Sequence, residues 1–286
     1  MAAVTTPAST TGATAVAGGR RPRARHRRLP VWHAFWILAA AAYFIVPVIS
    51  LVQFSFGGRV GTHSAGFHWY ATVFNDPSFR SSFWLSVQIA IETVVLSNLL
   101  LVPTAFWIHL RLPRLRPVMD FVSVLPFVVP PIVLIVGLIP FLQQFTFIYS
   151  RPEVLDFIYV VFAMPFLYRS LDAGLRAINL QTLAEASANC GGSTWSTLLR
   201  VVVPNLRSAI IGGSFLTVAI AMGEFTISSL LSFNTFPVYI FNIGQSTSNE
   251  AAALAVISLL LTWGLMIALY LVGRGGRTTA QIAATR

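Results

Sequence analysis

The chain has 286 residues, of which 56% are hydrophobic and only 10% are charged, and its mean hydropathy is +0.74. Because soluble domains carry charge on roughly a quarter of their residues, this composition excludes an ordinary soluble protein and indicates a polytopic membrane protein. The net charge of +10 would suit nucleic acid, but the arginines lie outside the apolar stretches, as topology signals do. We therefore expect lipid contact and no nucleic-acid partner.

Two residue types are informative through their scarcity. The sequence contains no lysine, and a P-loop needs a lysine beside its glycines to reach the phosphates of ATP. ATP chemistry would therefore belong to a partner chain, and we expect no catalytic residue, metal ligand or cofactor in this one. The single cysteine, Cys190, excludes an intrachain disulfide, and we interpret it as a small buried thiol.

The chain begins with a polar tail, residues 1–30. It has too few apolar groups to bury a core, so we expect it to be disordered, and it ends in a block of arginines. Such a block orients the first membrane span and can contact anionic lipid. The apolar stretch that follows is longer than the core of a signal peptide, so cleavage is not expected.

Six apolar stretches follow, and together they predict an all-α fold with six transmembrane helices in one domain, residues 31–275. We place the spans at about 34–54, 83–108, 118–138, 155–168, 210–233 and 252–272. The third contains Pro126, Pro130 and Pro131, so it must be kinked or broken among neighbouring helices. The fourth is short, and we expect it to extend toward Arg151 or Arg169. Residues 276–286 form a second polar tail.

One segment, about residues 180–204, is too polar to span a bilayer. A helix of small residues is predicted from Gln181 to Cys190. Gly191 and Gly192 then permit a left-handed turn, and Ser193 can cap a second helix. The segment therefore predicts a helix-turn-helix between the fourth and fifth spans.

The second helix of this segment has an apolar face that we expect to lie against the base of the membrane domain. Its members recur at helical spacing: Trp195, Leu198, Leu199 and Val202. Pro204 suits the first turn of the span that follows.

The arginines predict the orientation of the chain. With six spans and the amino terminus inside, Arg59, Arg80 and Arg151 fall outside, and the other sixteen of the nineteen fall inside. Because basic residues favour the cytoplasmic side, both termini and the 180–204 segment are predicted to be cytoplasmic.

Seven residues of the 180–204 segment resemble the EAA loop, whose pattern is EAA-x3-G-x9-[IV]-x-[LV]-P. They are Glu185, Ala186, Ser187, Gly191, Val201, Val203 and Pro204. The loop is typical of permease subunits of bacterial type I ABC importers, the binding-protein-dependent transport inner-membrane component family. Ser187 replaces the family's second alanine, and Val203 replaces its leucine. The Leu-Pro-x-x-x-Pro-Pro run of the third span also resembles this family, especially its polyamine, ferric and molybdate branches. Residues 222–231 look like the corresponding span of spermidine/putrescine-type permeases.

The resemblance implies a set of partners for a subunit that is not itself an enzyme. The first helix of the loop would be a coupling helix that docks on an ATPase. Two such ATPases bind ATP and magnesium, a second permease, identical or paralogous, completes the pathway, and an extracytoplasmic binding protein delivers substrate. The implied location is the bacterial plasma membrane. The loop belongs to a permease domain over residues 31–275.

Two acidic residues, Glu92 and Glu224, fall inside predicted spans, where a charge is costly. Glu92 is interpreted as structural. Glu224 lies on a small, polar face of the fifth span and either joins two helices or meets substrate. The other members of this candidate pathway face are Gly213, Thr217, Ala221 and Ser228.

No arginine or histidine lies in the middle of a predicted span, which favours a cationic substrate. Polyamines lead, and ferric ion, thiamine or an oxyanion are alternatives.

Two other classes of function remain open at this stage. An ion-coupled secondary transporter would use Glu92 and Glu224 as proton relays, but it commonly shows internal repeats, which we do not find. An intramembrane enzyme would need a pattern such as His-Glu-x-x-His or Gly-x-Ser-x-Gly, and neither occurs. Four of the five histidines are expected in or beside loops and interfaces, as ordinary solvated or interfacial residues: His33, His63, His68 and His109.

Overall fold

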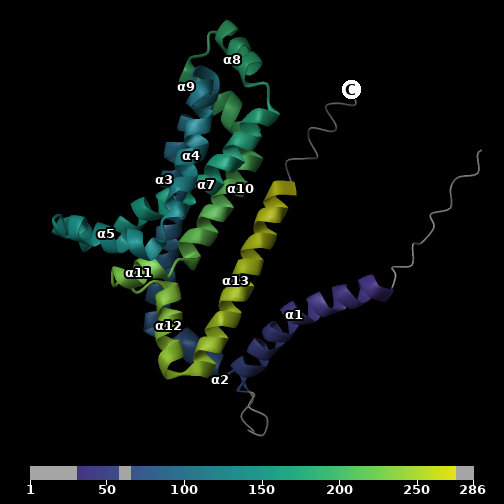
Figure 1. Ribbon diagram of the computed structural model, residues 1–286, viewed down its shortest axis with the longest axis vertical. Coiled ribbons are helices and arrows are strands. Elements are labelled where there is room, and N and C mark those ends of the chain that lie inside the picture. The colour runs from purple at the N-terminus through teal and green to yellow at the C-terminus, as the bar shows by residue number, and fades with distance from the viewer. Residues whose placement is uncertain (1–30, 58–65, 275–286) are drawn as a thin grey trace, which may run out of the picture. The chain divides into compact units, whose positions relative to one another are not determined.

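The computed structural model describes residues 31–57 and 66–274 (Figure 1). Two compact units divide the chain, Met1–Pro47 and Val48–Arg286, and the description below concerns the second unless stated. The predicted tails, 1–30 and 276–286, lie outside the described residues, as do Arg59 and His63.

Every regular element in the described ranges is helical, which confirms the all-α prediction. Unit 1 contains most of α1, an apolar helix that ends in unit 2. The helices are α1 (Val31–Ser55), α2 (His68–Asn75), α3 (Pro77–Arg111), η1 (Pro113–Leu115), α4 (Arg116–Val128), α5 (Pro131–Gln143), α6 (Thr146–Tyr149), α7 (Val154–Ala177), α8 (Leu180–Asn189), α9 (Thr194–Thr197), the π-helix η2 (Leu198–Val202), α10 (Val203–Gly223), α11 (Thr226–Leu230), α12 (Phe236–Ser246) and α13 (Ser248–Arg274).

Four described stretches are long and apolar enough to cross a membrane: Phe35–Ser55, Pro77–Arg111, Val154–Ala177 and Thr194–Leu230. The pair α4 and α5 adds a fifth if it forms one span, and the apolar part of α13, Ser248–Gly264, is shorter. The chain is thus a multi-pass helical protein, while the count of six spans stays a prediction.

The third predicted span is broken, as its prolines indicated. The helix on the carboxyl side of the break, α5, is bent by 90° from the helix before it. Val129, which precedes Pro130, has extended backbone angles, φ −94° and ψ 123°, because a residue before proline disfavours the helical region. Pro131 then occupies the first turn of α5, where its missing N–H leaves no unsatisfied bond.

The fourth and fifth predicted spans differ from their predicted limits. The fourth, α7, does not end near Arg169 but continues to Ala177, because Leu171 and Leu175 are buried in the core. The fifth was predicted as one helix over 210–233. It begins earlier, at Val203, and is interrupted after Gly223 by a break that separates α10 from α11.

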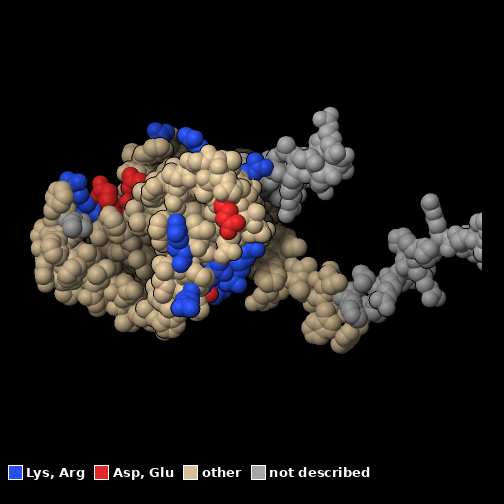
Figure 2. All heavy atoms as spheres, turned by 90° about the horizontal axis from the view of Figure 1, so that it is seen from above, with Lys and Arg blue, Asp and Glu red and all other residues tan. Residues whose placement is uncertain are grey.

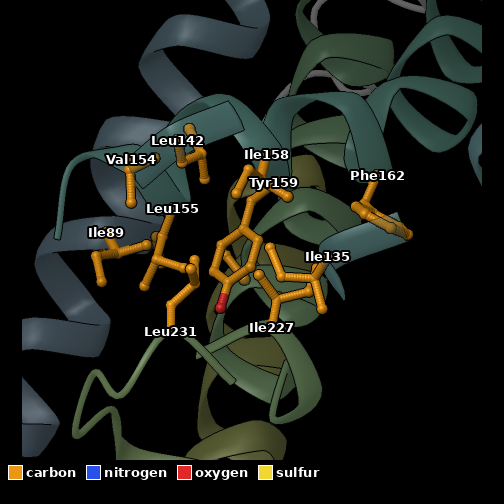
Figure 3. Packing of buried hydrophobic residues seen from close by; sticks show 12 residues of the cluster. Ile89, Ile135, Leu142, Val154, Leu155, Ile158, Tyr159, Phe162, Ile227 and Leu231 are labelled. Atoms are coloured by element: carbon orange, nitrogen blue, oxygen red, sulfur yellow. The ribbon is translucent and has the colours of Figure 1, made fainter. Parts of the chain in front are cut away.

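The core forms where α3, α7 and α10 pack together, and these helices run side by side in Figure 1. In one part, Tyr159 lies fully buried among Ile135, Ile158 and Ile227, as Figure 3 shows. A second part, nearer α8 and α9, surrounds Tyr168, which is also fully buried.

Candidate coupling loop and intramembrane polar groups

The 180–204 loop lies at one end of the α3, α7 and α10 bundle, where Figure 1 shows α8 and α9 together. Its first helix, α8, starts where Asn179 caps it: the Asn179 Oδ1 accepts a hydrogen bond from the Thr182 amide at 3.4 Å. The predicted helix over 181–190 is therefore confirmed within one residue at each end.

The turn after α8 has the predicted geometry. Gly191 has φ +82°, in the left-handed region that glycine adopts without a steric cost. The Gly192 amide donates to the Ser187 carbonyl at 2.8 Å, and the Ser193 Oγ accepts from the Ser196 amide at 3.2 Å. Helix end, turn and helix start are thus satisfied by local hydrogen bonds.

The outer surface of α8 carries mostly small, exposed side chains. Glu185 and Ala186 are exposed, whereas Ser187 is half-buried. Cys190 is exposed, so its interpretation as a buried thiol was wrong. The cause is the position of Cys190 at the end of α8, at the opposite end of that helix from its buried residue, Leu180.

The predicted apolar face of the second helix is only half buried. Leu198 and Val202 are buried, but Trp195 and Leu199 are 64% and 61% exposed. The reason is that the core covers only the side of the helix that carries Leu198 and Val202, while Trp195 and Leu199 lie on the adjacent, uncovered side. Among the motif residues, Val201 and Val203 are half-buried, and Pro204 is exposed in the first turn of α10.

Basic side chains gather at this end of the bundle. Figure 2 views the protein from the end that carries α8 and α9, and arginines are spread over the face. Exposed arginines of the helices that end here include Arg111, Arg114, Arg176 and Arg200. Such a distribution is expected of a cytoplasmic face.

A buried polar contact joins α3 to α7 just below the loop. The His109 Nε2 lies 2.9 Å from Asp172 Oδ1, and its Nδ1 lies 2.9 Å from the Ala105 carbonyl oxygen. Arg176 Nε is 2.8 Å from the other Asp172 oxygen. His68 is exposed as expected, but His109 is 4% exposed, so its solvated interpretation was wrong. A partner 63 positions away in sequence leaves no local signal.

The residues of the candidate pathway face are divided by the break in the fifth span. Gly213, Thr217 and Ala221 are buried on α10. A Cβ on Gly213 would lie 2.5 Å from Leu167 Cδ1 and 3.1 Å from Leu167 Cα, so this surface packs closely on α7. Ser228 is buried on α11 and accepts a hydrogen bond from the Thr235 hydroxyl at 3.0 Å.

Glu224 occupies the break itself, and the prediction that placed it inside a continuous helix was wrong. Its Oε1 accepts from the Thr226 amide at 2.9 Å, and its Oε2 accepts from the Ile227 amide at 2.9 Å. Tyr159 on α7 donates to Oε2 at 3.2 Å. The carboxylate therefore caps α11 and joins it to α7, because amides at a helix start need acceptors.

A second carboxyl group, which the sequence analysis missed, meets Glu92. Asp156 in the first turn of α7 is 5% exposed, accepts from the Thr93 hydroxyl at 3.4 Å and lies near Glu92. Gln88 donates to Glu92 Oε1 at 3.0 Å. Two carboxylates this close repel unless a proton or cation lies between them. The signal available in the sequence was an acidic residue, Asp156, at the start of the apolar stretch that forms α7.

At the opposite end of the bundle, Asp76 joins α3 to α12. Its Oδ1 accepts from the Ser78 amide at 2.8 Å and caps α3, and its Oδ2 accepts from the Tyr239 hydroxyl at 2.5 Å. The Tyr239 bond, with help from Ser78, holds the pKa of Asp76 below its ordinary value. Burial and the adjacent Asp76 raise the pKa of the Tyr239 hydroxyl.

Apolar helices of membrane-crossing length and an exposed, polar helix-turn-helix at one end define a multi-pass membrane protein. Residues 102–275 match the family described as "Binding-protein-dependent transport system inner membrane component". The chain belongs to this family and is a permease component of an ABC importer. The secondary transporter and the intramembrane enzyme are therefore not retained.

The chain is similar to named permeases along most of its length. It is 27% identical over 249 residues to the spermidine/putrescine transport system permease protein PotC of Escherichia coli (strain K12), covering 84% of this chain and 92% of PotC. It is 26% identical over 209 residues to PotB of Haemophilus influenzae, covering 66% and 72%.

The fold also resembles a solved permease structure. A chain of a bacterial ABC transporter involved in the import of the acidic polysaccharide alginate matches with a TM-score of 0.64 and 16% identity, over 87% of this chain and 96% of that one. A second structure contains the alginate transporter in complex with an alginate pentasaccharide-bound periplasmic protein. At this identity the likeness shows a shared fold.

Proposed function

We propose that this permease forms part of a substrate pathway and receives motion from a separate ATPase through α8. The observation that carries the proposal is the exposed side of α8 at Glu185 and Ala186, which leads to a turn at Gly191 that local hydrogen bonds hold in place. A small, exposed helix can enter a groove on a partner without displacing large side chains. The loop then continues without a break into α10, whose other end borders Glu224.

The substrate that we propose is a polyamine or another small cation. Two relatives carry the name spermidine/putrescine permease, which supports this class. The carboxyl pair Glu92 and Asp156 fits the same class, because a cation between two carboxylates relieves their repulsion, as a shared proton also does. Neither observation distinguishes polyamines from thiamine or ferric ion, which stay alternatives, while an oxyanion would be repelled by this pair.

The candidate pathway wall is the region where α10 ends and α11 begins. We propose that Gly213, Thr217 and Ala221 fix α10 on α7, while Glu224 and Ser228 hold the break open toward substrate. Irregular backbone at membrane depth is tolerated where it lies within protein or beside a water-filled cavity. Discontinuous helices of this kind commonly border transport sites.

The full assembly that we propose contains two ATPases, which bind ATP and magnesium, a second permease and an external binding protein. A neighbouring fold is named in complex with a periplasmic binding protein, which supports the last of these partners. The arginines around α8 support a cytoplasmic position for the loop and both termini. Membrane lipid would surround the exposed apolar helices.

The experiment that tests this function is co-purification from native membranes followed by a binding assay. We expect a P-loop ATPase and an extracytoplasmic binding protein to accompany the permease. The binding protein should bind spermidine or putrescine more tightly than thiamine, ferric ion or molybdate. A permease that purifies without any ATPase, yet transports alone in vesicles, would contradict the proposal.

A further inference from the structure

Two hydroxyl groups join the two helices of the 180–204 loop. The Thr197 Oγ1 donates to the Ser187 Oγ at 2.8 Å, from the last residue of α9 to the middle of α8. The same hydroxyl also donates to the Ser193 carbonyl oxygen at 3.0 Å, so its single proton is shared between two acceptors. We name the Ser187 and Thr197 pair the hydroxyl clasp.

The two ends of the clasp are anchored differently. Thr197 is 4% exposed and precedes Leu198, which belongs to the same core as Tyr168. On α8, by contrast, Leu180 at its first turn is the buried residue. The far half of α8 is therefore held to the bundle by the Gly191 turn and by the clasp.

Gly192 shows how tightly the turn is pressed onto Ser187. A Cβ at this position would lie 2.5 Å from the Ser187 Oγ and 2.8 Å from the Ser187 carbonyl oxygen. Real Cβ atoms do not approach a backbone oxygen this closely, so any side chain would displace α8 or the turn. The clasp and the side-chain-free turn therefore specify one position for the end of α8.

We propose that Ser187 is a positioning residue, whose bond to Thr197 sets the direction of α8 for the ATPase and passes its displacement to α10. This inference rests on the proposed function of the loop. The path is short and continuous: Thr197 leads directly into the π-helical turn and then into α10. Alanine, which the EAA pattern has at this position, carries no hydroxyl, so the clasp is a feature of this chain rather than of the motif.

A double-mutant cycle in the full-length permease tests the pair. Ser187→Ala and Thr197→Val each remove the bond while keeping similar volume, and Thr197→Val also removes the contact with the Ser193 carbonyl. Ser196→Ala is a control that removes a neighbouring hydroxyl outside the pair. We expect amide exchange at residues 186–192 to rise about three- to tenfold in either single variant, the effect of one net hydrogen bond. The double variant should rise no further, because partners in one bond are not additive.

Binding of the co-purified ATPase provides the second measurement. We expect its dissociation constant to rise about three- to tenfold in the single and double variants alike, while amide exchange in α10 stays at the wild-type rate. Exchange and affinity equal to wild type in both single variants would overturn the clasp. Faster exchange with unchanged affinity would overturn its role in positioning. If wild-type permease itself binds no ATPase, the proposed function fails, and the exchange data still decide whether the clasp holds α8.

Discussion

The hydroxyl of Tyr159 donates a hydrogen bond to the Glu224 carboxylate at 3.2 Å, between α7 and the break that separates α10 from α11. The same carboxylate accepts bonds from the amides of Thr226 and Ile227. One side chain therefore satisfies the exposed start of α11 and fixes it to the core. The irregular segment is a built feature of the pathway wall that we propose.

Glu224→Gln should reduce uptake more than it reduces the amount of folded, membrane-inserted permease. The substitution replaces one acceptor oxygen with an amide group that cannot accept from a backbone N–H. An amide at the start of α11 then loses its acceptor, which costs about 1–3 kcal/mol of stability. Uptake is measured per inserted molecule in vesicles. Tyr159→Phe is the matched control, which removes one bond and should have a smaller effect. Equal uptake per inserted molecule in Glu224→Gln would leave this residue only a helix-joining role.

Gly213→Ala should destabilise the packing of α10 on α7. The new Cβ would approach the Leu167 backbone at 3.1 Å and its side chain at 2.5 Å, and overpacking of this kind costs about 1–3 kcal/mol. Gly212→Ala is the matched control, because its Cβ would meet Ser170 Oγ at an ordinary 3.7 Å. Thermal unfolding in detergent should separate the two variants. Equal melting temperatures would show that the helices do not approach this closely.

Asp172→Ala should destabilise the permease more than Arg176→Ala. The first change leaves the buried His109 Nε2 without its partner, which costs about 1–3 kcal/mol. The second removes an exposed side chain whose ion pair contributes about 0–1 kcal/mol. Both are read from thermal unfolding of the purified protein. The reverse order would place the stabilising contact at Arg176 instead of His109.

The Asp76 and Tyr239 contact predicts a pH dependence with a defined sign. Because the pKa of Asp76 is lower in the folded protein, its contribution is present above the ordinary carboxyl value and is lost as pH falls through the folded value. The stability difference between wild type and Tyr239→Phe should be constant from about pH 7 to 5 and shrink below about pH 4. Thermal unfolding across this range checks it. A difference that vanishes between pH 7 and 5 would contradict the hydrogen bond.

Local signals in the sequence were sufficient to predict the helix-turn-helix of the loop and the break in the third span. Gly191 predicts a turn through its backbone freedom, Ser193 predicts a helix cap through its side-chain oxygen, and Pro130 predicts the break in its helix. The break at Glu224 could not be predicted in this way, because the Glu224 carboxylate meets the Tyr159 hydroxyl only in the folded protein.

Other contacts could not be read from the sequence, because they depend on partners far along the chain or on which side of a helix the core covers. His109 and Asp172 are 63 positions apart, and nothing near either residue marks the pair. The exposed Trp195 and Leu199 were assigned to a buried face from helical spacing, but the core covers only the adjacent side of the helix. The extra length of α7 likewise depends on burial of Leu175, a tertiary effect.

The most direct test of the account is a crosslink from α8 to the ATPase. Ala186→Cys in a Cys190→Ser background places the thiol on the exposed side of α8, and Ser246→Cys, exposed on α12 at the other end of the bundle, is the control. We predict that oxidation joins the first variant, but not the second, to an engineered cysteine in the ATPase groove. An active complex in which Ala186→Cys forms no crosslink anywhere on the ATPase would contradict docking through α8.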